Sequence, residues 1–165
     1  MQGRQLDILV ADDHRLTREI VGEVLKAIDC GRIRYAEDGS HAVSEIVAST
    51  PDIAIVDFDM PSSGLSVLEF VRRSSASPDD AIPMIVMTSL TAPQRVIALR
   101  DAGVNEVITK PFAAHTVLAK LAAIIDRPRT FIRSPGYVGP CRRRRTAANY
   151  RGPLRRDSDH ALLLG

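Results

Sequence analysis

Apolar and polar positions alternate in a regular order along residues 6–126, where short, continuously apolar runs are followed by longer amphipathic stretches. The short runs are typical of buried strands, and the stretches between them carry apolar residues at helical spacing. Five strands are predicted, over residues 6–11, 32–37, 53–56, 82–87 and 106–109. Five helices are predicted to follow them, over residues 15–28, 40–48, 64–73, 93–102 and 113–126. This alternation predicts an α/β fold with a five-stranded parallel sheet and helices on both of its faces.

Polar side chains follow several of the predicted strands, at the points where those strands end. They are Asp12, Asp13, Asp57, Thr88, Ser89 and Lys110. Taken singly, each has an ordinary structural explanation, such as a helix cap for an aspartate or a threonine and a surface position for the lysine. Ligands of parallel sheets bind beyond the carboxyl ends of the strands, where these residues converge. Three carboxylates at one edge repel one another, and a hard divalent cation, most simply Mg²⁺, would remove that penalty.

Four of these strand ends resemble the receiver domain of bacterial two-component response regulators. The matching segments are residues 10–14, 56–61, 86–89 and 108–112, and the resemblance covers residues 5–126. It implies a doubly wound, flavodoxin-like sheet with strand order 2-1-3-4-5. It also implies a signalling module that receives a phosphoryl group from a histidine kinase or phosphotransferase. Beyond its own phosphorylation and dephosphorylation, such a module is not an enzyme.

The resemblance implies a role for each polar residue at the strand ends. Asp57 would accept the phosphoryl group from a phosphohistidine. The ligands of Mg²⁺ would be the carboxylates of Asp12, Asp13 and Asp57 and the backbone carbonyl of Asp59. Thr88 would hydrogen-bond a phosphoryl oxygen, and Lys110 would pair with the phosphoryl charge. These roles suit the chemistry, because phosphoryl transfer needs a nucleophile in line and positive charge on the equatorial oxygens.

Two positions depart from the pattern of the receiver family. The aromatic residue that usually stands three positions before the lysine is replaced by Val107. The loop formed by residues 61–64 is one residue shorter than the common pattern. We therefore expect a competent phosphorylation site whose coupling to an output surface is weakened.

Charge divides the chain into two regions. Residues 1–126 hold 12 Lys+Arg and 18 Asp+Glu, a net charge of −6, whereas residues 127–165 hold 10 Arg and two Asp, a net charge of +8. We therefore predict a folded domain over residues 5–126 and an arginine-rich, ligand-binding tail over residues 127–165. The tail contains 4 Pro and 4 Gly and few apolar residues, a composition that predicts disorder in the free protein.

The tail contains an internal repeat. Residues 137–143 and 150–156 both read Tyr-x-Gly-Pro-x-Arg-Arg, with an offset of 13 residues. A run of arginines is often only a solvated charged segment, but solubility does not require a repeated tyrosine and Gly-Pro. The tail has no lysine, which favours a ligand that needs the planar guanidinium, such as a guanine edge or a phosphate. Tyrosine offers a face on which a base can stack.

Residues 130–160 resemble the arginine-rich extension of the CheY-like cyclic di-GMP effectors (the Cle group), which are stand-alone receivers. The resemblance implies that cyclic di-GMP binds to the tail, also as an intercalated dimer. The implied contacts are Tyr137, Arg142, Arg143, Arg144, Arg145, Tyr150, Arg155, Arg156 and Asp159. The resemblance further implies that the receiver docks on a flagellar switch protein and tunes motility.

The alternative is an ordinary phosphorylation-controlled receiver whose tail binds nucleic acid or acidic membrane through charge alone. The leading interpretation involves neither DNA nor a membrane. No apolar run approaches the length of a membrane span, and the N-terminus lacks the pattern of an export signal. Cys30 and Cys141 have no metal-ligand spacing and are predicted to be free thiols. These observations predict a cytoplasmic protein, and the resemblance adds recruitment to the flagellated pole.

Overall fold

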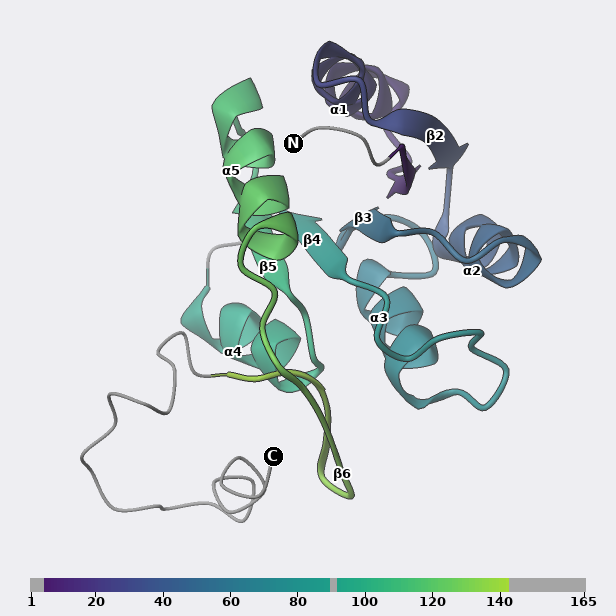
Figure 1. Ribbon diagram of the computed structural model, residues 1–165, viewed down its shortest axis with the longest axis vertical. Coiled ribbons are helices and arrows are strands. Elements are labelled where there is room, and N and C mark those ends of the chain that lie inside the picture. The colour runs from purple at the N-terminus through teal and green to yellow at the C-terminus, as the bar shows by residue number, and fades with distance from the viewer. Residues whose placement is uncertain (1–4, 90–91, 143–165) are drawn as a thin grey trace.

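The computed structural model describes residues 5–89 and 92–142 of the 165-residue chain. Its main sheet has five parallel strands in the order β2-β1-β3-β4-β5 (Figure 1). The strands are β1 (Leu6–Ala11), β2 (Gly31–Ala36), β3 (Ile53–Asp57), β4 (Met84–Thr88) and β5 (Glu106–Thr109). The helices are α1 (Arg15–Ala27), α2 (Gly39–Ala48), α3 (Gly64–Arg73), α4 (Pro93–Asp101) and α5 (Ala114–Ile125). The predicted fold class and strand order are both confirmed.

The helices and strands begin and end within two residues of their predicted bounds. The largest difference is at β4, which begins at Met84 and not at Ile82. Pro83 lies between them, and a proline nitrogen carries no hydrogen to donate to the ladder. The Pro83 carbonyl still accepts a hydrogen bond from the Ala54 N–H at 2.9 Å, so the chain is already aligned beside β3 before the strand begins.

The helices form a layer on each face of the sheet. Helices α1 and α5 pack on one face, and α2, α3 and α4 pack on the other. Alternate residues of β1 point into the two cores, so that Ile8 and Val10 lie in the α1–α5 core, whereas Leu9 and Ala11 lie in the other. All four are fully buried. A strand that is covered on both faces has no polar side, which explains the continuous apolar runs of the sequence.

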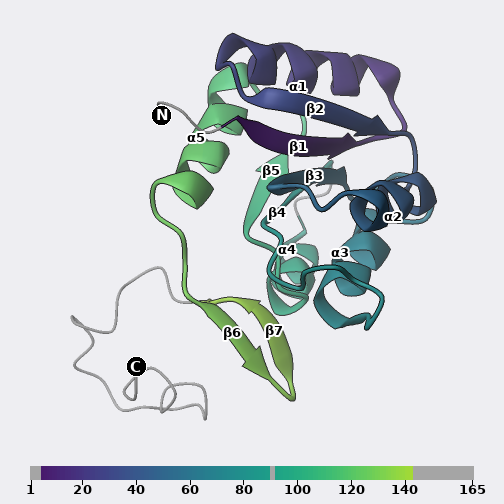
Figure 2. The same ribbon diagram turned by 45° about the vertical axis from the view of Figure 1, so that its right-hand side comes forward.

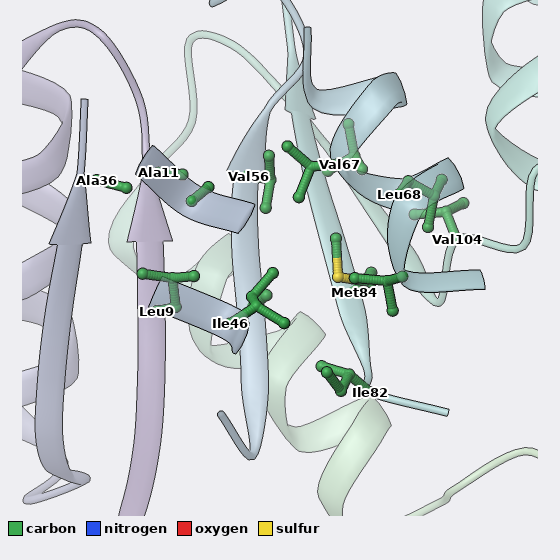
Figure 3. Packing of buried hydrophobic residues seen from close by; sticks show 14 of the residues in the cluster. Leu9, Ala11, Ala36, Ile46, Val56, Val67, Leu68, Ile82, Met84 and Val104 are labelled. Carbon is green, nitrogen blue, oxygen red and sulfur yellow. The ribbon is translucent and has the colours of Figure 1, made fainter. Parts of the chain in front are cut away.

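Close packing in the core sets the relative positions of the strand ends. In Figure 3, Leu9 and Val56 from the sheet pack against Ile46 of α2, while Met84 packs near Leu68 of α3. In the ladder, Ala11 is paired with Val56, and Val56 is paired with Val86. The residues that follow β1 and those that end β3 therefore lie side by side at one edge of the sheet.

The loop between β3 and α3 is held by close backbone contacts. Ser62 and Ser63 have positive φ angles of 56° and 21°, in a region that L-residues rarely adopt. A Cβ atom at Gly39 would collide with the carbonyl oxygen of Ser62, and one at Gly64 would collide with that of Asp57. Glycine is therefore required at both positions. The short loop is pressed between the start of α2 and the end of β3, and its backbone takes up the strain.

After α5 the chain forms a second, two-stranded antiparallel sheet, made of β6 (Phe131–Ser134) and β7 (Tyr137–Pro140) (Figure 2). The predicted disorder of the tail is therefore wrong for residues 131–140. The composition of the tail could not build a core of its own, but a hairpin that packs on an existing domain does not need one. Residues 143–165 lie outside the described residues, and for them disorder stays a prediction.

Candidate functional site

Three charged side chains meet at the carboxyl edge of the main sheet. Asp12 follows β1, Asp57 ends β3, and Lys110 follows β5. Lys110 Nζ lies 2.7 Å from Asp12 Oδ2 and 2.8 Å from Asp57 Oδ1. Asp12 is fully buried and Asp57 is 1% exposed, so one ammonium group bridges two carboxylates that water hardly reaches. The three groups together carry a net negative charge, which favours a further cation.

Asp57 is the least satisfied member of this group. Its Oδ1 is buried and, apart from the ion pair with Lys110, has no hydrogen-bond partner among the described residues. Burial raises the pKa of Asp57, and the negative charges of Asp12 and Asp59 raise it further, while Lys110 opposes the shift. Such an oxygen has lone pairs available for a metal ion or for a new covalent bond.

Lys110 stays protonated in this environment. Burial acts to lower the pKa of its ammonium, but the hydrogen bonds and charges of Asp12 and Asp57 outweigh burial, and the pKa is raised. The backbone positions Lys110 as well, since its N–H donates to the Thr88 carbonyl at 2.8 Å. A permanent positive charge therefore lies beside the buried carboxylate of Asp57.

The other side of the site is formed by Asp13 and His14. His14 Nδ1 lies 2.8 Å from Asp13 Oδ1 and 3.5 Å from Asp12 Oδ1. The His14 backbone N–H donates to Asp12 Oδ1 at 2.8 Å, so Asp12 also stabilises the turn that starts α1. Asp12 is not the helix cap, because the N-cap of α1 is His14 and makes no side-chain cap hydrogen bond. The second carboxylate oxygen of Asp12 faces Lys110. The place of His14 beside the carboxylates was not predicted, although its position directly after the Asp12–Asp13 pair was the available signal.

The donor set fits a hard divalent cation. One ligand atom each from Asp12, Asp13 and His14 lie within 4.8 Å of one another. Carboxylate oxygens are the ligands that Mg²⁺ prefers, and the free lone pairs of Asp57 Oδ1 add a further oxygen at the same edge. The Asp59 carboxylate points elsewhere, because it accepts from Ser89 N–H at 3.2 Å and lies 3.4 Å from Arg95 Nη1. The metal would therefore not use the Asp59 carboxylate, and a role for the Asp59 backbone carbonyl stays a prediction.

A family model described as the response regulator receiver domain matches residues 8–122 of the chain. The chain belongs to the response regulator receiver family. Among its curated relatives is the response regulator MprA of Mycolicibacterium vanbaalenii, which is 33% identical over 120 residues. The aligned region covers 73% of this chain and 50% of that protein. The chain therefore spans about half the length of the curated relatives that it matches.

Solved structures give the same picture. The chemotaxis response regulator CheY4 of Vibrio cholerae is 25% identical, with a TM-score of 0.66, and the match covers 73% of this chain and 98% of that one. The isolated REC domain of RcsB from Salmonella enterica serovar Typhimurium, solved in the presence of the phosphomimetic BeF3−, has a TM-score of 0.65 over 84% of this chain and 96% of its own. At 19% identity the second match concerns the fold alone.

Membership of the receiver family settles the general class of the protein. Receiver domains are phosphoacceptor signalling modules of two-component systems and not classical enzymes, and they interact with histidine kinases or phosphotransfer partners. They typically bind Mg²⁺ in an acidic pocket, which here corresponds to the Asp12–Asp13 group.

The remaining predicted residues of the receiver lie close to this pocket. Thr88, at the end of β4, is 1% exposed. Val107, which takes the position of the usual aromatic residue, is partly buried in β5 and packs against the α2–α3–α4 core. An aliphatic side chain in this position has no ring that could swing between an inner and an outer position when Thr88 moves.

The predicted residues of the tail are separated from this pocket. Only Tyr137 and Arg142 belong to the described residues, and they follow the turn of the β6–β7 hairpin, whose contacts lie at the amino ends of β4 and β5. The guanidinium of Arg142 lies 4.0 Å from the centre of the Tyr137 ring. The other predicted contacts lie outside the described residues: Arg143, Arg144, Arg145, Tyr150, Arg155, Arg156 and Asp159.

Proposed function

We propose that Asp57 is the phosphoacceptor of this receiver. The observation that carries the proposal is the buried Asp57 Oδ1, which lies 2.8 Å from a protonated lysine and has no partner besides that lysine among the described residues. In the reaction, a carboxylate oxygen of Asp57 attacks the phosphorus of a phosphohistidine. The P–O bond forms, the P–N bond breaks, and the imidazole leaves with the electron pair of that bond.

The neighbouring side chains supply what this transfer requires. Lys110 Nζ, already within ion-pair distance of Asp57, would pair with an oxygen of the transferred phosphoryl group. Thr88 would donate its hydroxyl to another phosphoryl oxygen. The carboxylates of Asp12, Asp13 and Asp57, with the Asp59 carbonyl, would hold the Mg²⁺ whose charge neutralises the remaining oxygens.

Phosphorylation of the full chain tests this proposal. The protein is incubated with Mg²⁺ and a small acyl phosphate donor, and its intact mass is measured with and without the chelator EDTA. We expect one added phosphoryl group in the wild-type protein when Mg²⁺ is present, and none in Asp57→Asn. Asp126→Asn, an exposed residue beyond α5, is the matched control and should react like the wild type. Uptake of phosphate by Asp57→Asn would contradict the assignment.

We further propose that the arginine-rich tail binds cyclic di-GMP, in monomeric or intercalated dimeric form. The ligand offers two guanines and two phosphates, which match the duplicated Tyr-x-Gly-Pro-x-Arg-Arg motif. Its support from the described residues is that Tyr137 and Arg142 already place a flat guanidinium against an aromatic ring. The same two groups can stack a guanine and pair with its edge or with a phosphate. The candidate contacts are the nine residues predicted from the sequence.

Calorimetric titration of cyclic di-GMP into the full chain and into a chain ending at residue 142 tests this second proposal. The shorter chain keeps the hairpin, so a difference between the two isolates residues 143–165. We expect saturable binding to the full chain that heparin and DNA do not displace. Equal competition by these polyanions, together with a steep salt dependence, would favour the alternative of an ordinary receiver with a tail that binds through charge.

The proposed output is docking of the receiver on a flagellar switch protein, which would tune motility from the flagellated pole in the cytoplasm. Val96 and Ile97 on α4 support it, because both are large apolar side chains that are 41% and 48% exposed. No helix within the described residues is long and apolar enough to cross a membrane. Val96→Asp with Ile97→Asp should abolish capture of the purified switch protein. Leu16→Asp, on exposed α1, should not.

A further inference from the structure

The β6–β7 hairpin packs on the turns that precede β4 and β5, at the end of the sheet opposite to Asp57. The hairpin packs against the buried side chain of Arg72. This guanidinium donates to the carbonyls of Asp80 at 2.6 Å and Gly103 at 3.0 Å. The Phe131 ring of β6 lies 5.4 Å from the guanidinium carbon of Arg72. Arg133 of β6 forms two hydrogen bonds with the Asp80 carboxylate, at 2.7 and 2.8 Å. The hairpin is thus a docked element of the receiver and not a free arm.

A second set of contacts joins β7 to the end of α4. Arg142 Nη1 lies 3.3 Å from Asp101 Oδ1, at the last residue of α4. The guanidinium of Arg142 covers the Tyr137 ring, and the Tyr137 hydroxyl donates to the Pro140 carbonyl at 2.7 Å. Tyr137 and Arg142 are therefore used within the folded chain.

Two glycines allow β7 to approach the receiver this closely. Gly103 and Gly139 have positive φ angles of 91° and 155°. A Cβ atom added at Gly139 would lie only 2.6 Å from the Gly103 Cα, and one at Gly103 would meet the Val138 carbonyl. The Gly-Pro of the first repeat copy thus has a structural use, since it lets the backbone of β7 pack directly on the turn after α4.

From these contacts we infer that the first repeat copy is a latch, in which Asp101 and Tyr137 hold Arg142 and keep it from a ligand. This inference rests on the proposed binding of cyclic di-GMP to the tail. A guanine could stack on Tyr137 only after Arg142 leaves the ring, and a phosphate would replace the Asp101 carboxylate as the partner of the guanidinium. Arg142 Nε is buried and has no hydrogen-bond partner among the described residues, so its donor capacity is not fully used in the latched state.

The latch links ligand binding to the turn between α4 and β5. If the ligand binds the Arg142 guanidinium, the ion pair with Asp101 is broken. The close contact of Gly139 with Gly103 is then less stabilised, because that ion pair holds the same two segments together. A change that weakens the latch strengthens ligand binding, by at most the factor by which it shifts the latch equilibrium. The ion pair is partly exposed, with side-chain exposures of 27% for Arg142 and 44% for Asp101, and such pairs correspond to about a two- to fivefold change in an equilibrium constant.

The test is calorimetric titration of cyclic di-GMP into the full chain of the wild type, Asp101→Asn and Asp126→Asn. The two variants make the same change in net charge, but only Asp101 contacts Arg142. We expect Asp101→Asn to bind about two- to fivefold more tightly than Asp126→Asn. In hydrogen–deuterium exchange, saturating ligand should lower the protection of residues 101–105 and 137–141 in the wild type.

The outcomes separate the latch from the tail function on which it rests. If the wild-type chain does not bind cyclic di-GMP, the proposed tail function fails and the latch fails with it. If the wild type binds but the two variants have equal affinity, only the latch is refuted. Protection of residues 101–105 that rises with ligand would also refute it, because the first copy would then present the ligand site and not withhold it.

Discussion

Two buried cations, Lys110 and Arg72, occupy opposite ends of the same sheet, and they are satisfied to different degrees. Arg72 donates to the carbonyls of Asp80, Gly103 and Ile82 and to the side chain of Asn105, all between 2.6 and 3.0 Å. Lys110 instead bridges two buried carboxylates, one of which keeps an oxygen without a hydrogen-bond partner among the described residues. Each guanidinium nitrogen of Arg72 is paired, whereas the Asp57 carboxylate beside Lys110 retains unused bonding capacity.

The difference separates a structural network from a reactive one. The four hydrogen-bond acceptors of Arg72 are neutral, and burial lowers the pKa of its guanidinium to about 10, which still leaves it charged at neutral pH. Its acceptors come from the turns before β4 and β5, so this residue ties those turns together. At the other end, the bonding capacity left at Asp57 is what the proposed phosphoryl group and metal ion would use.

Of the substitutions proposed for the two ends of the sheet, replacement of Arg72 is expected to lower the stability of the protein most. Arg72→Met should lower the free energy of unfolding by about 3–5 kcal/mol, because four acceptors, two of them in buried and two in partly buried hydrogen bonds, lose a charged donor. Chemical denaturation of the full chain measures this. Arg73→Met, at the exposed neighbouring position, should change stability by less than about 0.5 kcal/mol. Similar losses in the two variants would show that the Arg72 network is not what holds this end of the sheet.

A smaller loss is expected when the hairpin loses its contact with that network. The Phe131 ring lies between Arg72 and Arg133, at 5.4 and 4.8 Å from their guanidinium carbons. Phe131→Ala should cost about 1–2 kcal/mol in the unfolding free energy. A chain ending at residue 126 should show a loss at least as large, while a chain ending at residue 142 should not. If all three forms were equally stable, the hairpin would not be an integral part of the domain.

At the carboxyl edge of the sheet, removing the charge of Asp57 should raise the free energy of unfolding and not lower it. The pKa of Asp57 is raised in the folded protein, first by burial and then by nearby carboxylates, so its ionisation opposes folding as the pH rises through that pKa. Asp57→Asn removes this cost, and we expect it to be more stable than the wild type at neutral pH. Thermal unfolding over a pH series should show the difference shrinking towards about pH 4, where the wild-type carboxyl is protonated. A variant less stable than wild type at neutral pH would mean that Lys110 outweighs burial.

How much the sequence revealed also differs between the two ends. The receiver strands, their order and the residues at their carboxyl ends were predictable, because short apolar runs followed by polar residues report burial and register directly. The hairpin was not predicted, because composition tests whether a segment can build a core of its own and not whether it can pack on another. Tyr137 and Arg142 were predicted only as ligand contacts of a disordered tail, yet Arg142 contacts both Asp101 and the Tyr137 ring. Arg133 of the same tail pairs with Asp80.

The smallest effect is expected from the partly exposed ion pair between Arg133 and Asp80. Hydrogen bonding by Arg133 lowers the pKa of Asp80, so Asp80 contributes stability above its unfolded-state pKa and loses it as the pH falls through the lowered value. Asp80→Asn should therefore be less stable than the wild type at neutral pH and should match it once the pH lies below that lowered pKa. The pair is partly exposed, so roughly 1 M salt should shrink the difference, whereas the Arg72→Met difference should persist because that network is buried. In an Arg133→Gln background, Asp80→Asn should have no further effect, and a full effect there would assign the lowered pKa to another group.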